Sequence, residues 1–310
     1  MPEGPEVRRY AEAIAGAIEN QPILDISART RVARAWLETR RIDLIGGLVE
    51  SVRSHGKHLV GRIAGGFYFH AHLMMWGRWE VHDGPPPDTV DRRERARIVT
   101  PAATAILLSA PVFDVGEGEP YDEVEHLATL GPDALPYPDA GPFDVEEFLE
   151  RLRLPENLDR AIGVVLLDQR VVAGLGNYLR AEILFECRID PWRAVRDLSP
   201  DQLACLGDTI PYVTSRAFST GGVTVPDDVR ARMREDAALV YRVGHDYGTR
   251  HWVFRRTNLP CLECDDVVRQ LRQTTYEDEE GERSRIIYFC PTCQATSVAV
   301  KPPRRSKVPA

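Results

Sequence analysis

The amino-acid sequence predicts an α+β fold with more than one domain, on three observations. Short strand-like runs, separated by turn residues, follow one amphipathic segment through the first 130 residues. Apolar residues at helical spacing then dominate from about residue 145 to about residue 245. Two closely spaced cysteine pairs bound a short segment near the C-terminal end. We therefore expect a β domain, a helical domain and a small cysteine-bounded module.

The first domain, expected over residues 1–130, begins with a helix over residues 3–19. Apolar residues such as Val7, Ile14 and Ile18 share one face of it, and Pro22 follows its end. Gly65-Gly66 predicts a type I′ hairpin, because both central residues of that turn have positive φ. The strands are expected over residues 23–27, 48–54, 58–63, 67–73 and 105–108.

The rest of the chain divides by composition. Gly, Pro and Asp over residues 131–144 indicate a linker, and Asp144 is placed to cap the helix that follows. The helical domain is expected over residues 145–245, the cysteine-bounded module over residues 250–297, and a basic, disordered tail over residues 298–310. The helices are expected over residues 145–152, 158–167, 177–187, 200–218 and 229–241.

The bulk properties narrow the class of protein only in part. The net charge of −8 argues mildly against a nucleic-acid partner, but binding depends on a local basic surface rather than on the total charge. The sequence has no apolar run of the roughly 18 to 20 residues that cross a bilayer, and its N-terminus is unlike a signal peptide. We expect a soluble cytoplasmic protein without membrane contact.

Four of the six cysteines have the spacing of metal ligands. Cys261 and Cys264 are separated by two residues, as are Cys290 and Cys293. Two such turns supply the four thiolates of a tetrahedral Zn²⁺ site, which leaves no open position, so the ion would be structural. A zinc ribbon and a zinc finger both fit this spacing. Cys187 and Cys205 stand alone in helical segments.

The turn between two predicted helices has two readings. Gly174 and Gly176 permit a tight turn, and Asn177 stands where an N-cap belongs. Free N–H groups at the start of such a helix suit a phosphate. An ordinary helical hairpin is the simpler alternative, and physics alone favours it. Pro2, Glu3 and Glu6 likewise read by themselves as an ordinary helix start.

Four motifs in order change these readings. MPEGPEVRR at residues 1–9, HGKHL at 55–59, LLDQRVVAGLGNYLRAEILFECRIDPW at 166–192 and RIIYFCPTCQ at 285–294 together resemble the formamidopyrimidine-DNA glycosylase/endonuclease VIII family. The resemblance spans nearly the whole chain. It implies an N-terminal β-sandwich, a helix–two-turn–helix domain and a C-terminal zinc finger with one structural Zn²⁺.

The resemblance implies catalytic roles for residues near the N-terminus. In the family, the amine of the N-terminal proline attacks C1′ of a damaged nucleotide, and here Pro2 becomes terminal once Met1 is removed. Glu3 would protonate the sugar ring oxygen, and Glu6 would orient the amine or a water molecule. Lys57 matches a residue of the family that grips phosphate.

The resemblance also implies DNA-binding residues outside the N-terminal block. Asn177 and Arg285 match the family's phosphate contacts around the lesion. Met75 falls on the wedge that fills the space of an extruded base, with Met74 and Trp76 beside it. Core packing after a strand remains the competing explanation for these three apolar side chains.

The branch of the family sets the expected substrate. The corresponding loop of the oxidised-purine branch carries a basic residue, whereas residues 106–114 hold none. This difference favours oxidised pyrimidines, such as thymine glycol, as substrates. Residues 220–224 and the long stretch 227–256 argue for the oxidised-purine alternative. A non-catalytic zinc-finger protein that binds DNA is a second alternative. We expect a monomeric, nucleoid-associated enzyme that acts on DNA with oxidised bases or abasic sites.

Overall fold

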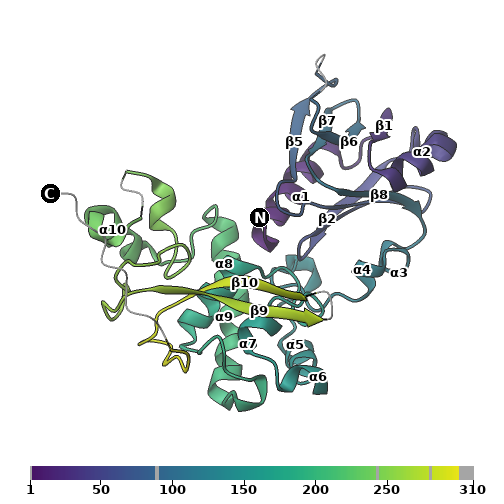
Figure 1. The fold of residues 1–310 in the computed structure, drawn as a ribbon. Helices are drawn as coiled ribbons and strands as arrows, with labels where there is room; N and C mark the ends of the chain where they lie inside the picture. Colours follow the sequence, from purple (N-terminus) through teal and green to yellow (C-terminus); the bar gives the residue numbers. More distant parts are fainter. Residues whose placement is uncertain (1, 88–90, 242–243, 279–280, 300–310) are drawn as a thin grey trace. The chain divides into compact units, whose positions relative to one another are not determined.

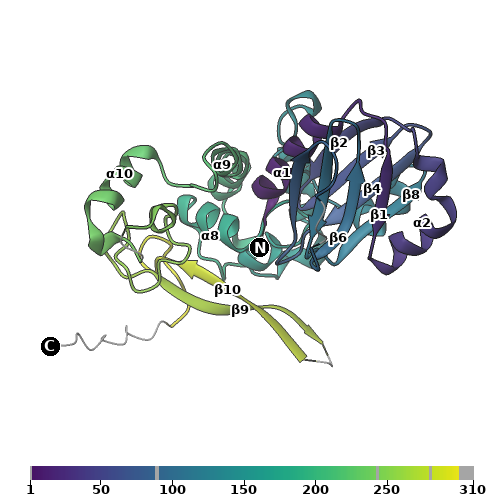
Figure 2. The same ribbon diagram turned by 90° about the horizontal axis from the view of Figure 1, so that it is seen from above.

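The computed structural model describes residues 2–87, 91–241, 244–278 and 281–299. The chain forms two compact units, Met1–Pro142 and Phe143–Ala310 (Figures 1 and 2). Met1 and the expected disordered tail from residue 300 onward lie outside the described residues. Among the residues described, no helix is both long and apolar enough to cross a membrane.

The first unit contains two four-stranded antiparallel sheets, ordered β1-β6-β7-β5 and β2-β3-β4-β8. Helix α1 (Gly4–Ile18) packs against strands of both sheets. The strands are β1 (Asp25–Ala28), β2 (Val49–His55), β3 (His58–Ile63), β4 (Phe67–His72), β5 (Arg78–Asp83), β6 (Glu94–Val99), β7 (Ala103–Leu108) and β8 (Val112–Glu117).

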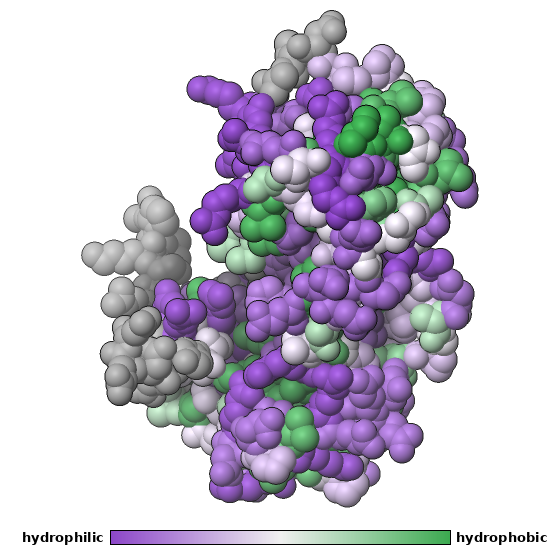
Figure 3. All heavy atoms as spheres, turned by 90° about the vertical axis from the view of Figure 1, so that its right-hand side faces the viewer, coloured by the Kyte–Doolittle hydropathy of each residue, from purple (hydrophilic) through white to green (hydrophobic). Residues whose placement is uncertain are grey.

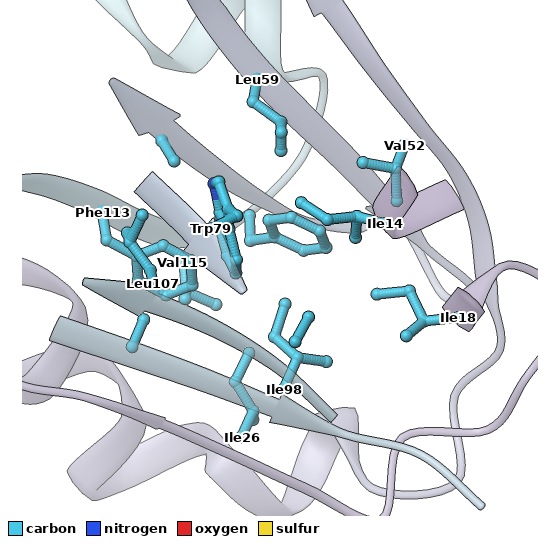
Figure 4. Packing of buried hydrophobic residues seen from close by; sticks show 14 of the residues in the cluster. Ile14, Ile18, Ile26, Val52, Leu59, Trp79, Ile98, Leu107, Phe113 and Val115 are labelled. Atoms are coloured by element: carbon cyan, nitrogen blue, oxygen red, sulfur yellow. The ribbon is translucent and has the colours of Figure 1, made fainter. Parts of the chain in front are cut away.

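One hydrophobic core joins the two sheets and α1 (Figure 4). Ile98 and Leu107 come from one sheet, Leu59 and Phe113 from the other, and Ile14 from the helix. The predicted β-sandwich with an N-terminal helix is therefore confirmed. Because side chains alternate along a strand, residues between these core positions lie on the outer face of their sheet.

The β3–β4 hairpin turns where the sequence predicts it. Gly65 and Gly66 have φ values of +92° and +79°, so both central residues adopt the conformation that glycine permits without strain. The turn fixes the strand register, which pairs Gly61 with Phe69 and His58 with His72.

A second helix in this unit, α2 (Arg31–Leu44), is absent from the sequence prediction, which expected one helix only. Its buried stripe is narrow, since Ala33, Leu37 and Leu44 are its buried residues and most other positions are polar or charged. It packs on β1 and β8 and leaves Val32 and Ile42 exposed. Figure 3 looks onto the side of the molecule that carries α2 and shows hydrophobic residues among a mostly hydrophilic surface.

Residues 131–142 pack within the first unit, although their composition suggests a linker. Gly131, Ala134 and Leu135 are buried, and the Asp133 carboxylate accepts a hydrogen bond from the Leu135 N–H at 3.0 Å. Tyr137 lies between the guanidinium groups of Arg8 and Arg53, at 3.0 and 4.3 Å from its ring centroid. Helices α3 (Pro120–Glu123) and α4 (Glu125–Ala128) and the 3₁₀ turn η1 (Pro138–Ala140) belong to the same part of the chain.

The second unit is helical and ends in a β-hairpin, in agreement with the predicted fold class. The Asp144 side chain accepts a hydrogen bond from the Glu147 N–H at 2.8 Å and so caps α5 as predicted. Its elements are α5 (Val145–Leu152), α6 (Pro155–Leu158), α7 (Ile162–Val165), α8 (Asn177–Glu186), η2 (Val195–Asp197), α9 (Pro200–Ser219), α10 (Asp227–Glu235), η3 (Ala237–Leu239), η4 (Asp246–Thr249), β9 (Arg269–Asp278) and β10 (Gly281–Phe289).

Three expectations about this unit need correction. The helix expected over residues 158–167 is a single turn, α7, because Ala161 before it is extended; the preceding turn, α6, ends at Leu158. The helix expected over residues 229–241 ends at Glu235, and Asp236 then caps a separate 3₁₀ turn. Cys187 and Cys205, expected to stand alone, form a disulfide between the end of α8 and α9, with their Cα atoms 5.7 Å apart.

The hairpin and the helices of the second unit share one hydrophobic core. Phe185 of α8 belongs to the same buried cluster as Ile287 of β10, Val253 and two of the paired cysteines, Cys261 and Cys290. The cysteine-bounded module therefore packs as part of the helical unit.

We predict that Gly61→Ala destabilises the first unit by about 1–3 kcal/mol. A Cβ at residue 61 would lie 2.1 Å from atoms of the buried Phe69 ring, so the core would have to shift. Gly16→Ala is the matched control, because a Cβ there meets nothing within 4 Å on an exposed helical surface and should stabilise by about 0.5–1 kcal/mol. Urea unfolding of both variants measures the difference. Equal stabilities would contradict the tight packing at Gly61.

Candidate active site

The start of α1 carries the predicted catalytic carboxylates, with Glu3 as its N-cap and Glu6 in its first turn. Pro2 precedes the helix and is half-buried, whereas Glu3 is only 2% exposed. The Glu3 backbone N–H donates to one carboxylate oxygen of Glu6 at 2.9 Å, and the other oxygen accepts from Arg9 at 2.8 Å. Glu6 is thereby held by groups on both sides, and the chain immediately after Pro2 has a fixed conformation.

Lys57 lies in the tight turn between β2 and β3 and is 9% exposed. Gly56 beside it has a φ of +54° and donates its backbone N–H to the Asp133 carboxylate. Burial raises the pKa of Asp133, while His55 and Arg8 oppose that rise electrostatically. Since Arg8 belongs to the second turn of α1, Asp133 links the start of this helix to the Lys57 turn.

The loop between β4 and β5 presents apolar side chains to solvent. Met74, Met75 and Trp76 are 48%, 58% and 76% exposed, so the competing explanation of core packing does not hold for them. The loop is tight, because Gly77 donates its N–H to the Leu73 carbonyl at 2.8 Å. A Cβ on Gly77 would lie 2.4 Å from that carbonyl oxygen.

Histidines next to Lys57 and this loop are held neutral. Burial, followed by repulsion from neighbouring histidines, lowers the pKa of His58 to about 2. Burial, followed by the charge of Lys57, lowers the pKa of His72 to about 4. Neither ring carries a charge at neutral pH, so the positive charge in this turn resides on Lys57.

Asn177 occupies the first position of α8 in the second unit. The N-cap is Gly176, which corrects the expectation that Asn177 itself caps the helix. Gly174 has a φ of +106°, and the Gln169 side chain accepts from the Gly174 N–H and donates to the Leu167 and Leu175 carbonyls. The turn is thus held by one amide side chain, with Asn177 at its helical end.

Arg285 lies on β10, opposite Gln273 of β9, and its side chain is exposed. The neighbouring Ile286 carbonyl accepts a hydrogen bond at 3.0 Å from Arg180, a fully buried residue in α8. Arg180 also donates to the Gly163 carbonyl and to the Gln273 side chain. The strand that carries Arg285 is therefore fixed to the helix that begins with Asn177.

The four paired cysteines form one cluster. Their Sγ atoms all lie within 4.8 Å of one another, with Cys261 and Cys293 3.8 Å apart and Cys264 and Cys290 3.5 Å apart. Zn–S bonds of about 2.3 Å in a tetrahedron place sulfur atoms about 3.8 Å apart, so the cluster fits Zn²⁺. All four positions would be filled by thiolates.

Two family models match the chain. The N-terminal domain of formamidopyrimidine-DNA glycosylase matches residues 1–108, and the H2TH domain of that enzyme matches residues 130–228. Endonuclease 8 of Escherichia coli O17:K52:H18 is 32% identical over 295 residues, which is 95% of this chain and 100% of that protein. The Shigella sonnei (strain Ss046) protein of the same name gives the same values.

The chain belongs to the formamidopyrimidine-DNA glycosylase/endonuclease VIII family. The predicted resemblance and the predicted enzyme class, a DNA glycosylase with AP lyase activity, are thereby confirmed.

Solved structures share the fold of this family member. The complex of Lactococcus lactis Fpg with abasic-site DNA has a TM-score of 0.71 at 22% identity and covers 94% of this chain and 99% of that one. The complex of the same enzyme with DNA containing an oxidised pyrimidine has a TM-score of 0.71 at 21% identity, with the same coverage.

Several residues that organise the site were missed in the sequence. Asp133 stands in a Pro- and Gly-rich stretch that resembles a linker. Arg180 and Glu182 lie in α8, where charged residues usually face solvent, yet both are fully buried. The Glu182 carboxylate accepts hydrogen bonds from the backbone N–H groups of Trp252, Val253 and Phe254. The Thr220–Thr224 stretch also supplies a partner, since the Thr224 hydroxyl donates to Glu182.

We predict one zinc ion per chain and its loss in Cys290→Ser, because a hydroxyl is a poor substitute for a thiolate ligand. Metal analysis of the purified protein measures the content. The same variant should unfold the hairpin and weaken DNA binding, as thermal unfolding and a binding assay would show. Cys205→Ser is the control for zinc content only, since Cys205 lies outside the cluster but is bonded to Cys187. Full zinc content in Cys290→Ser would contradict the assignment.

Proposed function

We propose that this chain is a bifunctional DNA glycosylase and AP lyase that removes oxidised bases, with a preference for oxidised pyrimidines. The observation that carries the proposal is the N-terminal block, in which Pro2 stands directly before the buried Glu3, the N-cap of α1. A protein that only binds DNA has no need of a terminal secondary amine. We expect it to act as a monomer on DNA in the cytoplasm.

The reaction begins with the Pro2 amine, free once Met1 is removed. A terminal amino group has a pKa of roughly 7.7 to 8.0, so a useful fraction is neutral near pH 7. Its lone pair forms a bond to C1′ of the damaged nucleotide, and the bond from C1′ to the base breaks with the electron pair leaving on the base. The base takes up a proton as it leaves.

Sugar opening and strand cleavage follow from the charge on nitrogen. Protonation of the ring oxygen by Glu3 breaks its bond to C1′ and leaves a cationic iminium. Loss of a C2′ proton then expels the 3′ phosphate, and a second elimination expels the 5′ phosphate. Glu6, held by Arg9 and the Glu3 N–H, would orient the amine or a water molecule.

Positive and neutral donors would hold the phosphates around the lesion. Lys57 supplies a point charge, Arg285 a planar fork and Asn177 a neutral amide at the start of a helix. Exposed Met75, with Met74 and Trp76, would fill the space that the extruded nucleotide leaves. Zn²⁺ on Cys261, Cys264, Cys290 and Cys293 would supply folding energy to the hairpin that carries Arg285.

The β7–β8 connection supports the preference for pyrimidines. It contains only Ser109, Ala110 and Pro111, and Ala110 is fully buried. A turn this short has no basic side chain to read an oxidised purine. The alternative substrate class, oxidised purines, draws its support from the length of residues 227–256, which add α10 and two 3₁₀ turns.

We predict that Pro2→Gly lowers strand cleavage by on the order of tenfold or more, equivalent to about 1.4 kcal/mol of activation free energy. Glycine keeps a terminal amine, but its imine with the sugar is cationic only when protonated, whereas the iminium of proline is always cationic. Borohydride trapping on lesion DNA and cleavage rates measure the effect, after mass spectrometry has verified the loss of Met1. Pro85→Gly, in an exposed loop, is the control. Undiminished cleavage with a free terminus would remove Pro2 from its role.

We also predict faster excision of thymine glycol than of 8-oxoguanine opposite cytosine, in duplexes that are otherwise identical. Single-turnover rates for the two substrates decide between the two branches of the family. A higher rate for 8-oxoguanine would establish the oxidised-purine alternative. Lack of cleavage of both, together with tight binding, would favour a non-catalytic DNA-binding protein.

A further inference from the structure

A row of polar side chains crosses the outer face of the β2-β3-β4-β8 sheet. Leu59, Phe69, Ala71 and Phe113 point into the shared core. Strand alternation therefore places His58, His70, His72 and Asp114 on the opposite face. The register brings them together, since His58 pairs with His72 across β3 and β4, and His70 pairs with Asp114 across β4 and β8.

Three of these side chains form a continuous hydrogen-bonded chain. Nδ1 of His70 lies 3.1 Å from a carboxylate oxygen of Asp114, and Nε2 of His70 lies 2.9 Å from Nδ1 of His58. His70 is 1% exposed and His58 is 7% exposed, whereas the Asp114 side chain is 28% exposed. The chain thus runs from a partly hydrated carboxylate to a buried ring.

The carboxylate dictates which nitrogen carries each proton. Asp114 accepts only, so Nδ1 of His70 must carry the hydrogen. When Nε2 of His70 carries no hydrogen, it accepts the hydrogen on Nδ1 of His58. Each ring is held in one tautomer and one orientation by the next.

The hydrogen-bonded series Asp114–His70–His58 is one of three attachments that hold the Lys57 turn. His55, two residues before Lys57, bonds through its ring to the Gly131 carbonyl at 2.9 Å and to the Tyr121 hydroxyl at 3.2 Å. Gly56 donates to the Asp133 carboxylate. His58, directly after Lys57, is held by His70. Both sides of Lys57 are thereby tied to other parts of the first unit.

The same hydrogen-bonded series contacts the loop that carries Met75. The His58 and His72 rings are in contact, with centroids 4.6 Å apart. His72 accepts the Met74 N–H through Nδ1 at 3.2 Å, at a residue whose φ is +52°. Movement of the His58 ring would therefore disturb the start of the loop as well as the Lys57 turn.

The neutral state of these rings depends on their surroundings. The groups that face His58 and His72 are His55 from β2, Lys57 from the turn, His70 from β4 and His126 from α4, with Asp114 on β8 and Asp133 beside Gly56. The folded pKa values of about 2 for His58 and about 4 for His72 lie below the ordinary value of 6.5. Acid therefore destabilises the fold as pH falls below about 6.5, because the unfolded chain binds protons first.

We propose that Asp114, His70 and His58 are a positioning network that fixes the Lys57 turn and the 73–77 loop for DNA binding. The inference rests on the DNA-binding roles proposed above for Lys57 and for that loop. The three residues act through Lys57 and His72 and are not catalytic residues.

The first test observes the free protein without DNA. ¹⁵N NMR of the histidine rings at neutral pH should show a single tautomer with the proton on Nδ1 for both His58 and His70. His72 should carry its proton on Nε2, because its Nδ1 accepts from Met74. In Asp114→Asn the His70 signal should shift, whereas Asp114→Glu should retain the wild-type pattern. Mixed tautomers at His58 or His70 in the wild-type protein would overturn the network.

The second test is a double-mutant cycle on the affinity for a duplex that contains a tetrahydrofuran abasic-site analogue. His70→Phe and Lys57→Ala should each raise the dissociation constant by about tenfold or more, since the loss of one hydrogen bond to a charged group such as a phosphate is enough for that factor. The double variant should have about the same dissociation constant as the weaker-binding single variant, because both changes remove the same interaction with DNA. His82→Phe on β5 is the matched control and should bind like wild type.

The outcomes separate this inference from the proposed function. Additive losses of affinity, or wild-type affinity in His70→Phe, would refute the network. The proposed function would still stand in that case if the wild-type protein is trapped on lesion DNA. Lack of binding and trapping by the wild-type protein itself would refute both. Thermal unfolding checks that each variant folds. If His70→Phe does not fold, the cycle is run with Asp114→Asn, whose partly exposed position tolerates an amide, and the same criteria apply.

Discussion

Hydrogen bonds to the Asp133 carboxylate fix the conformation of the part of the first unit that carries Lys57. The Asp133 carboxylate accepts from Gly56 and Leu135 and lies close enough to Arg8 to interact with its charge. Polar groups removed from water cost free energy unless they are paired, so these bonds are strongly specified once the segment after α4 covers the sheet. The first helix, the Lys57 turn and the covering segment consequently adopt one mutual arrangement.

In the second unit, buried charged side chains likewise fix the arrangement of distant segments. Arg180 and Glu182 stand two residues apart on α8 and are completely buried, yet their partners differ in kind. The guanidinium donates to backbone carbonyls of residues 163 and 286, and the carboxylate accepts from three consecutive N–H groups at residues 252–254. Charge-assisted bonds to backbone fix segments far apart in sequence, whichever side chains those segments carry. One helix thereby fixes both the strand of Arg285 and the segment at residues 252–254.

The sequence predicts the parts of the molecule that depend on local chemistry. The Gly65-Gly66 turn, the Asp144 cap and the cysteine cluster each follow from a few adjacent residues. It fails where tertiary packing decides. Helix α2 buries three residues of a mostly polar segment, and residues 131–142 look like a linker from their Pro and Gly content although Gly131, Ala134 and Leu135 are buried. His58, His70 and His72 alternate with apolar residues as in a strand with one face in solvent, so their burial is seen only in the folded structure. The roles of Pro2, Glu3 and Arg285 came from the family resemblance and not from periodicity.

The core shared by α8 and the hairpin limits how freely this architecture can be rearranged. Phe185 and Ile287 are buried in one cluster with Cys261 and Cys290, so two of the proposed metal ligands are also packing residues of the helical unit. Excised from its helices, the cysteine module would expose an apolar surface that no cation covers. The module is an integral part of the helical unit, and we expect it to need α8 in order to fold.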